Sequence, residues 1–123
     1  MTSLKNQRNL SEGFQNVFHF SAPTGYSNDP NGLCFWHGKW HLFYQALPTP
    51  DREHPCWSWG HAISDDLIHW QDLPTAIEPG PETGSWSGAT WVEDDRVIAM
   101  YYGYGRGIMA AVSKDENLTE WEK

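Results

Sequence analysis

Asp29 is the side chain in this sequence whose setting most suggests chemistry. It stands inside the pentapeptide Asn28-Asp29-Pro30-Asn31-Gly32, and the other members of that pentapeptide are residues that favour turns. Asp also favours turns, and Asn-Gly between apolar runs is typical of a tight hairpin. A carboxylate held rigidly in a partly desolvated site could instead act as a nucleophile. The pentapeptide therefore predicts a turn and leaves both roles open for Asp29.

One reaction that such a carboxylate can start is hydrolysis of a glycosidic bond, which generally needs a second carboxyl group to protonate the leaving oxygen. Asp65 and Asp66 lie where we expect a turn, and capping of that turn is the favoured role for both. The acidic run 93–95 is typical of a solvated hairpin tip. Glu78 and Glu82 flank a Pro/Gly-rich loop and could face a site, but no spacing supports this role. The residues alone therefore offer no clear partner for Asp29.

Metal and cofactor chemistry finds no support in the sequence. The six histidines show no H-E-x-x-H spacing, and we interpret His61 and His69 as structural. Cys34 and Cys56 cannot form a disulfide framework and fit no zinc pattern, so we expect both to be small buried hydrophobic residues. We therefore predict no metal and no cofactor.

The composition favours a neutral partner and excludes others. The chain has 16 acidic and 8 basic residues and a formal net charge of -8, which argues against nucleic acid and anionic membranes as partners. Its 8 Trp residues include core residues, but indole rings also offer the flat faces on which sugar rings stack. The N-terminal stretch has no apolar segment typical of a signal peptide, and no run approaches the length of a membrane span. We therefore predict a cytoplasmic location.

The elements that must position these residues are expected to be strands. Short runs rich in β-branched and aromatic residues recur between clusters of Gly, Pro, Asn and Asp, whereas helical periodicity is scarce. This pattern predicts an all-β chain of hairpins, with turns at 92–97 and 113–118 and a longer loop at 46–56. We expect strands at 32–36, 39–45, 57–64, 67–71, 86–92, 96–102 and 107–113.

A repeat favours one all-β architecture over the others. The sequences HAISDDLIHW (61–70) and AAVSKDENLTEW (110–121) share Ala, an apolar residue, Ser, any residue and Asp, followed by Leu and Trp. They lie about 50 residues apart, a spacing typical of β-propeller blades. Ser and Asp would tighten a turn, and Leu and Trp would fill the space beneath it. A common β-turn used twice is the plainer explanation, but the matched spacing argues against it.

The length does not suffice for a closed propeller. Propellers usually have about 4–8 blades, and at this period 123 residues supply about two and a half. Three alternatives remain: an incomplete propeller, a subunit that closes only by association, or a smaller sandwich. About two and a half blades would also leave apolar faces uncovered, so we expect poor solubility or association.

Four motifs resemble those of glycoside hydrolase family 32, the family of invertases, levanases and fructan hydrolases. These motifs occur in the family's order and approximate spacing. The resemblance covers residues 18–123 and leaves 1–17 as an N-terminal extension. It implies about the first two to two and a half blades of a five-bladed β-propeller that acts on β-fructofuranosides such as sucrose or fructans. The motifs are SNDPNG (27–32), HLFYQ (41–45), WGHAISDDLIHW (59–70) and WSGAT (86–90).

The resemblance also implies roles for individual residues. Asp29 matches the family's nucleophile, which forms a covalent fructosyl-enzyme in a retaining mechanism. Asn28 and Gln45 match ligands of the fructose unit, and Trp86 and Ser87 match an aromatic residue and a serine at the sugar site. Many family members also carry Trp-Gly-Asn shortly before the WGHA motif, where this chain has His54-Pro55-Cys56. We expect Trp57 or Trp59 to replace the missing indole.

Two other family motifs do not occur in these 123 residues. They are an Arg-Asp-Pro motif that stabilises the transition state and a Glu-Cys motif that supplies the general acid. Loss of a general acid alone costs a factor of roughly 10²–10⁴ in rate. Three hypotheses follow: a truncated fructosidase, a carbohydrate-binding remnant without turnover, or one chain that self-associates or pairs with a complementing chain. The choice among sucrose, sucrose phosphate, inulin and levan stays open.

Overall fold

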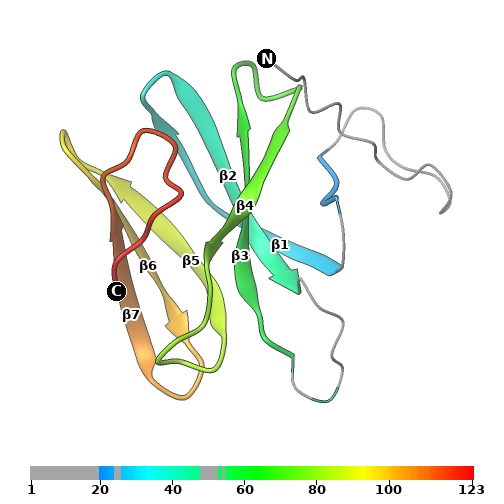
Figure 1. Ribbon diagram of the computed structural model, residues 1–123, viewed down its shortest axis with the longest axis vertical. Helices are drawn as coiled ribbons and strands as arrows, with labels where there is room; N and C mark the ends of the chain where they lie inside the picture. Colours follow the sequence, from blue (N-terminus) through cyan, green and yellow to red (C-terminus); the bar gives the residue numbers. More distant parts are fainter. Residues whose placement is uncertain (1–19, 24–25, 48–52, 54) are drawn as a thin grey trace, which may run out of the picture.

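The computed structural model describes residues 20–23, 26–47, 53 and 55–123, and it is all-β in the described part. Seven strands form two antiparallel sheets that stand side by side (Figure 1). The strands are β1 (Tyr26–Trp36), β2 (Lys39–Leu47), β3 (Ser58–Ser64), β4 (Gln71–Ile77), β5 (Ser85–Val92), β6 (Val97–Gly103) and β7 (Gly107–Ser113).

Both sheets are simple meanders in which each strand pairs with the next one along the chain. The first sheet has the order β1-β2-β3-β4 and the second has the order β5-β6-β7. After β7 the chain turns back, and a single bridge pairs Val112 with Glu122 in the position of a fourth strand. The second sheet therefore repeats the first and stops as its fourth strand begins.

Alternation of buried and exposed residues explains how the second sheet packs. In β6, Val97, Ala99 and Tyr101 are buried, whereas Met100 is 54% exposed between them. Successive side chains of a strand point to opposite faces, so one face of the sheet packs inward. The opposite face carries further exposed apolar side chains, among them Ile108. The expected uncovered apolar face is thus present, while association through it stays a prediction.

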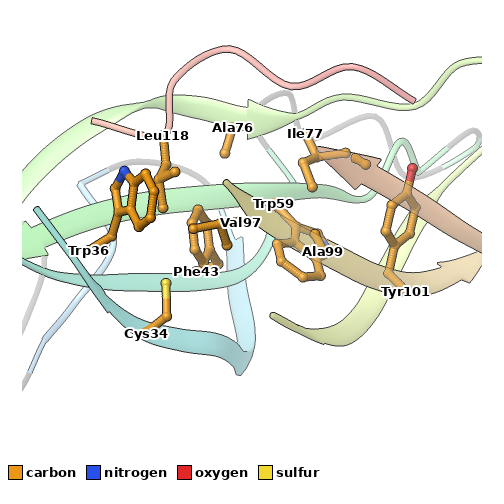
Figure 2. Packing of buried hydrophobic residues seen from close by; sticks show 11 residues of the cluster. Cys34, Trp36, Phe43, Trp59, Ala76, Ile77, Val97, Ala99, Tyr101 and Leu118 are labelled. Carbon is orange, nitrogen blue, oxygen red and sulfur yellow. The ribbon is translucent and has the colours of Figure 1, made fainter. Parts of the chain in front are cut away.

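The core lies between the two sheets and draws residues from both (Figure 2). Trp59 and Phe43 are fully buried, and their rings lie 5.4 Å apart between centroids. Met109 and Trp121 pack against the edge of this cluster. Its buried members are Cys34, Trp36, Phe43, Trp59, Ala76, Ile77, Val97, Ala99, Tyr101, Ala111 and Leu118.

The repeated turn predicted from the sequence is confirmed in its backbone. Asp66 Oδ1 accepts hydrogen bonds from the backbone N–H groups of Ile68 and His69, after Ser64 has capped the start of the same turn. In the second copy Asp115 accepts from the N–H groups of Asn117, Thr119 and Glu120. Capping is therefore the role of both Asp residues, as expected for Asp66.

The leucine of each copy has the same unusual conformation but a different environment. Leu67 has φ 65° and Leu118 has φ 51°. Leu118 is fully buried, whereas Leu67 is 44% exposed, so the expected packing beneath the turn holds only for the second copy. The strand predicted at 67–71 is also wrong. Backbone groups at 68 and 69 are bound to Asp66 and cannot join a ladder, so β4 begins at Gln71.

The other sequence-based boundaries agree with the structure or cannot be compared with it. The turns at 92–97 and 113–118 lie between β5 and β6 and after β7, as predicted. The loop predicted at 46–56 and the extension at 1–17 fall partly or wholly outside the described residues. Within the described part of the chain no helix is long and apolar enough to span a membrane.

A buried pair of histidines joins β2 and β3. Nδ1 of His41 lies 3.0 Å from Nε2 of His61, and both rings are fully buried. Burial, with a smaller contribution from His41, lowers the pKa of His61 to about 3. Burial also lowers the pKa of His41. Both rings are therefore neutral in the folded protein at neutral pH, and the placement of His61 fits the structural role expected for it.

We expect the free energy of unfolding to decrease as the pH falls below about 6.5, because only the unfolded chain then binds protons on these histidines. For His61 the loss reaches about 2 kcal/mol at about pH 5 and grows until the pH nears its folded pKa of about 3. Urea unfolding at about pH 7.5 and about pH 5 measures this difference. The exposed-turn variant His37→Asn should keep the pH dependence and His61→Gln should reduce it. Equal stability of the unmodified protein at both pH values would contradict the assignment.

Candidate active site

The residues around Asp29 are part of strand β1, so the prediction that they form a turn is wrong. Asn28 pairs with Gln45 of β2, and Pro30 pairs with Tyr44. Asp29 is therefore an extra residue between two consecutive pairs of the ladder. Such a β-bulge bends a strand and re-aims a side chain. The bulge, rather than a turn, gives Asp29 its orientation.

Gly32 shows why turn-forming residues nevertheless occur in this strand. A second irregularity of the ladder lies between Asn31 and Cys34, and Gly32 within it has φ 60°. A Cβ atom at Gly32 would lie 2.9 Å from the ring of Trp59, so space as well as conformation requires glycine. Pro30 is tolerated because β1 is the edge strand of its sheet.

Asp29 lines a cavity of about 350 Å³ between the two sheets. All but one of the described lining residues were candidates from the sequence, and the structure brings those candidates together. Their roles in binding and catalysis stay predictions. The lining residues are Asn28, Asp29, Gln45, Trp57, Trp86, Ser87 and Tyr102.

Strand β5 is tied to the first sheet by a series of hydrogen bonds, which we call the β5 seam. It begins with the backbone N–H of Ser85, which donates to the carbonyl of Trp57 at 2.8 Å. The further bonds are Gln45 Nε2 to Ser85 O at 3.0 Å, Trp59 Nε1 to Trp86 O at 2.8 Å, Ser87 Oγ to Asp29 Oδ2 at 3.1 Å and Thr90 Oγ1 to Gly32 O at 2.9 Å.

The bond from Ser87 to Asp29 orients the carboxylate within the cavity. It engages Oδ2 alone, and among the described residues Oδ1 has no hydrogen-bond partner. Gln45 is 5% exposed, and its amide nitrogen is held by Ser85. The amide oxygen of Gln45 is a further acceptor for a ligand hydroxyl. The site thus offers one oriented nucleophile and fixed polar groups beside it.

Trp59 does not lie in this cavity, contrary to the expectation that it contacts the sugar. Its side chain is fully buried in the core, and its indole N–H donates to the carbonyl of Trp86. Trp59 therefore supports Trp86 from behind. Trp57 is half-buried and lines the cavity, so it is the indole that can replace the one missing from the family motif.

Tyr102 is the lining residue that the sequence analysis missed. Its ring centroid lies 5.5 Å from that of Trp86, and Tyr104 stacks on the same indole at 5.1 Å with an interplanar angle of 11°. The aromatic run Tyr101-Tyr102 and the nearby Tyr104 carried a signal for an aromatic surface. Nothing local showed that β6 would place these rings against Trp86.

Glu82 is buried in a hydrogen-bond network and does not line the Asp29 cavity. Its Oε1 atom accepts from Ser85 Oγ at 2.9 Å and from Tyr101 OH at 2.7 Å, and Lys123 Nζ also donates to it. Burial alone would raise the pKa of Glu82, but the hydrogen bonds from Lys123 and Tyr101 outweigh it and lower the pKa to about 2. Because Ser85 also holds Gln45, this network anchors the start of the β5 seam.

The remaining candidates have ordinary structural partners. Asp65 pairs with Lys39, and Glu93 pairs with Arg96 at the hairpin tip. Cys34 is buried as expected, but Cys56 is exposed, so that prediction is wrong. Cys56 precedes β3 and lies outside the core, which explains its exposure. In the described part of the chain no group of three or more His, Cys, Asp or Glu side chains is placed to hold a metal ion.

Comparison with known proteins gives this geometry a family. Residues 19–123 match the family model described as "Glycosyl hydrolases family 32 N-terminal domain". The chain belongs to glycoside hydrolase family 32. It is 44% identical over 88 residues to the sucrose-6-phosphate hydrolase of Escherichia coli, which covers 69% of this chain and 18% of that protein.

Solved structures of family 32 enzymes agree with the fold. The Bombyx mori β-fructofuranosidase superposes with a TM-score of 0.72 at 35% identity, covering 87% of this chain and 24% of that one. The fructan 1-exohydrolase IIa of Cichorium intybus in complex with 1-kestose has a TM-score of 0.75 at 30% identity, covering 88% of this chain and 22% of that one. The two sheets are therefore the first blades of the five-bladed family 32 propeller, as predicted.

The chain spans about a fifth of the length of the curated relatives it matches. The second blade has three complete strands and the first bridge of a fourth. Residues 1–19 lie outside the described part of the family 32 chain, so the boundary after residue 17 stays a prediction.

We expect Glu82→Leu to lower the free energy of unfolding by about 2–4 kcal/mol, because Tyr101, Ser85 and Lys123 would lose their shared acceptor. Glu82→Gln, which keeps the volume and one acceptor oxygen, should cost less. Urea unfolding with tryptophan fluorescence measures both changes.

The exposed neighbour Glu120 provides the matched control for this prediction. Its side chain lies outside the network, so Glu120→Leu should change stability little. Equal effects of Glu82→Leu and Glu120→Leu would show that the Glu82 network does not anchor the fold.

Proposed function

We propose that this chain supplies the nucleophile and much of the fructose-binding surface of a retaining β-fructofuranosidase. The observation that carries the proposal is the bulged Asp29, hydrogen-bonded to Ser87 and lining one cavity with Asn28 and Gln45. Membership of family 32 supports it, because named relatives act on fructose-containing sugars, such as the sucrose-6-phosphate hydrolase of Escherichia coli. The proposed ligand is a fructose-containing saccharide.

The first half-reaction assigns distinct roles to the residues of the cavity. A carboxylate oxygen of Asp29 attacks the anomeric carbon of the fructosyl unit, and the bond from that carbon to the leaving oxygen breaks with its electron pair. Ser87 holds the other carboxylate oxygen in place. Asn28 and Gln45 bind sugar hydroxyls, and Trp86 and Trp57 provide apolar faces for the ring. Water then attacks the anomeric carbon of the fructosyl ester, which releases fructose and restores Asp29.

A second carboxyl group must protonate the leaving oxygen of a natural substrate. Asp29 is the only carboxylate among the described residues of its cavity, and the 123 residues contain no Arg-Asp-Pro or Glu-Cys motif. We therefore expect the acid and the transition-state stabiliser from a polypeptide segment other than residues 1–123. Residues 18–123 form the propeller part in this proposal, and self-association or pairing with a complementing chain stays a prediction.

A substrate that needs no acid separates the nucleophile from its missing partner. We expect the chain to release p-nitrophenolate from p-nitrophenyl β-fructofuranoside, because this leaving group departs without protonation. Asp29→Asn should lower that rate by about a thousandfold or more, since an amide is a poor nucleophile. Absorbance measures release, and mass spectrometry of the quenched protein detects the fructosyl adduct on Asp29.

The control for this experiment is Asp65→Asn, which changes an exposed carboxylate that pairs with Lys39. It should leave the rate unchanged. Equal rates in the unmodified chain and Asp29→Asn would refute the nucleophile assignment. Sugar binding without release of p-nitrophenolate would instead favour the carbohydrate-binding remnant.

We expect Gln45→Ala to weaken fructose binding about fivefold to thirtyfold, because one buried hydrogen bond to the sugar is lost. Titration calorimetry with fructose measures the dissociation constant. Gln71→Ala, at an exposed position of β4, should bind like the unmodified chain. Equal affinities in Gln45→Ala and Gln71→Ala would remove Gln45 from the sugar site.

A further inference from the structure

A second and larger cavity lies beside the one that Asp29 lines. It has a volume of about 820 Å³, against about 350 Å³ for the first. The two cavities share Trp57 and Trp86, and the described lining of the second does not include Asp29. Pro55, Pro79 and Tyr104 add further apolar surface to it. Both volumes fall within the range of about 300–1,000 Å³ that is typical of ligand sites.

Hydrogen bonds and ring stacking hold the wall of this second cavity in place. Tyr104 stacks on Trp86 with ring centroids 5.1 Å apart. The backbone of Tyr104 donates to Gly84 at 2.9 Å and accepts from Thr83 at 3.0 Å. The carbonyl of Trp57 accepts from Ser85 at 2.8 Å. The aromatic surface is therefore formed before any ligand arrives, which lowers the entropic cost of binding.

The chemistry of the lining favours a neutral ligand with a flat apolar face. Sugar rings present such a face through their C–H groups, and indole and phenol rings stack on it. The charged side chains in the described lining are acidic, Glu53 and Glu82, and Glu82 is held in its network with Lys123. A phosphorylated group would gain no cation from these residues.

We propose that the second cavity binds the neutral sugar unit attached to the fructosyl unit, and that Tyr104 is the residue that decides this binding. This inference rests on the proposed function, since it requires the fructosyl unit to occupy the cavity of Asp29. The shared residues Trp57 and Trp86 place the bond between the two sugars at the border of the cavities.

Titration calorimetry with two ligands separates the subsite from the fructose site. Fructose fills only the first cavity, whereas sucrose fills both. Tyr104→Ala should leave the affinity for fructose unchanged and weaken sucrose about threefold to tenfold, because a stacked ring is lost. Tyr104→Phe should restore sucrose binding. Trp91→Ala, at an exposed indole outside both described linings, should bind both sugars normally.

Cys56 offers an independent chemical readout. It is exposed and lines the second cavity, whereas Cys34 is buried and burial raises the pKa of its thiol. Sucrose should therefore slow the alkylation of Cys56 by iodoacetamide, and fructose at the same occupancy should not. This experiment uses the unmodified chain and does not depend on the folding of a variant.

The outcomes distinguish the subsite from the proposed function. If neither sugar binds, the proposed function fails and the subsite fails with it. If fructose binds but Tyr104→Ala weakens sucrose no more than fructose, or sucrose does not protect Cys56, the subsite alone is overturned. Tighter binding of sucrose 6-phosphate than of sucrose would overturn the assignment of a neutral ligand.

Discussion

The arrangement of this protein depends on the β5 seam, the hydrogen bonds that join strand β5 to the first sheet. Each sheet is a meander that pairs only within itself, so packing and this seam determine how the sheets meet. The seam uses residues that also form the site: Ser87 binds Asp29, and Ser85 binds Gln45. Because the contacts that join the blades also orient the site residues, the site cannot form before the sheets have docked.

Burial of polar groups in and around the seam makes that docking specific. Glu82 gathers Ser85 and Tyr101 on one carboxylate oxygen, and the indole N–H of the buried Trp59 reaches the carbonyl of Trp86. A buried polar group without its partner is costly, so a shifted register between the sheets would leave several of these groups unsatisfied. The buried Trp59 and Phe43 supply the apolar area that holds the sheets together, and the polar bonds select one arrangement.

The two cavities follow from the same geometry. Trp86 follows Ser85, the first residue of β5, and it carries Tyr102 on one cavity and Tyr104 on the other. One indole held from behind by Trp59 thus forms part of both walls. This explains how a small part of a propeller can present a continuous surface for two sugar units beside a single carboxylate.

Local sequence determined those features that depend on short-range physics. Alternation of apolar residues located six of the seven strands, and the Ser-x-Asp motif predicted a turn whose hydrogen bonds run between neighbours in the chain. The motifs of the family also identified Asp29, Gln45 and Ser87 as candidates. Only the tertiary structure decided that Asp29 lies on a bulge, because a bulge exists only relative to the partner strand β2. It likewise decided that Trp59 is core and Trp57 is surface, since β3 is buried on both faces and its pattern does not distinguish them. The places of Tyr102 and Tyr104 depend on contacts with Trp86 across 16 and 18 positions of the chain, and no local preference encodes such contacts.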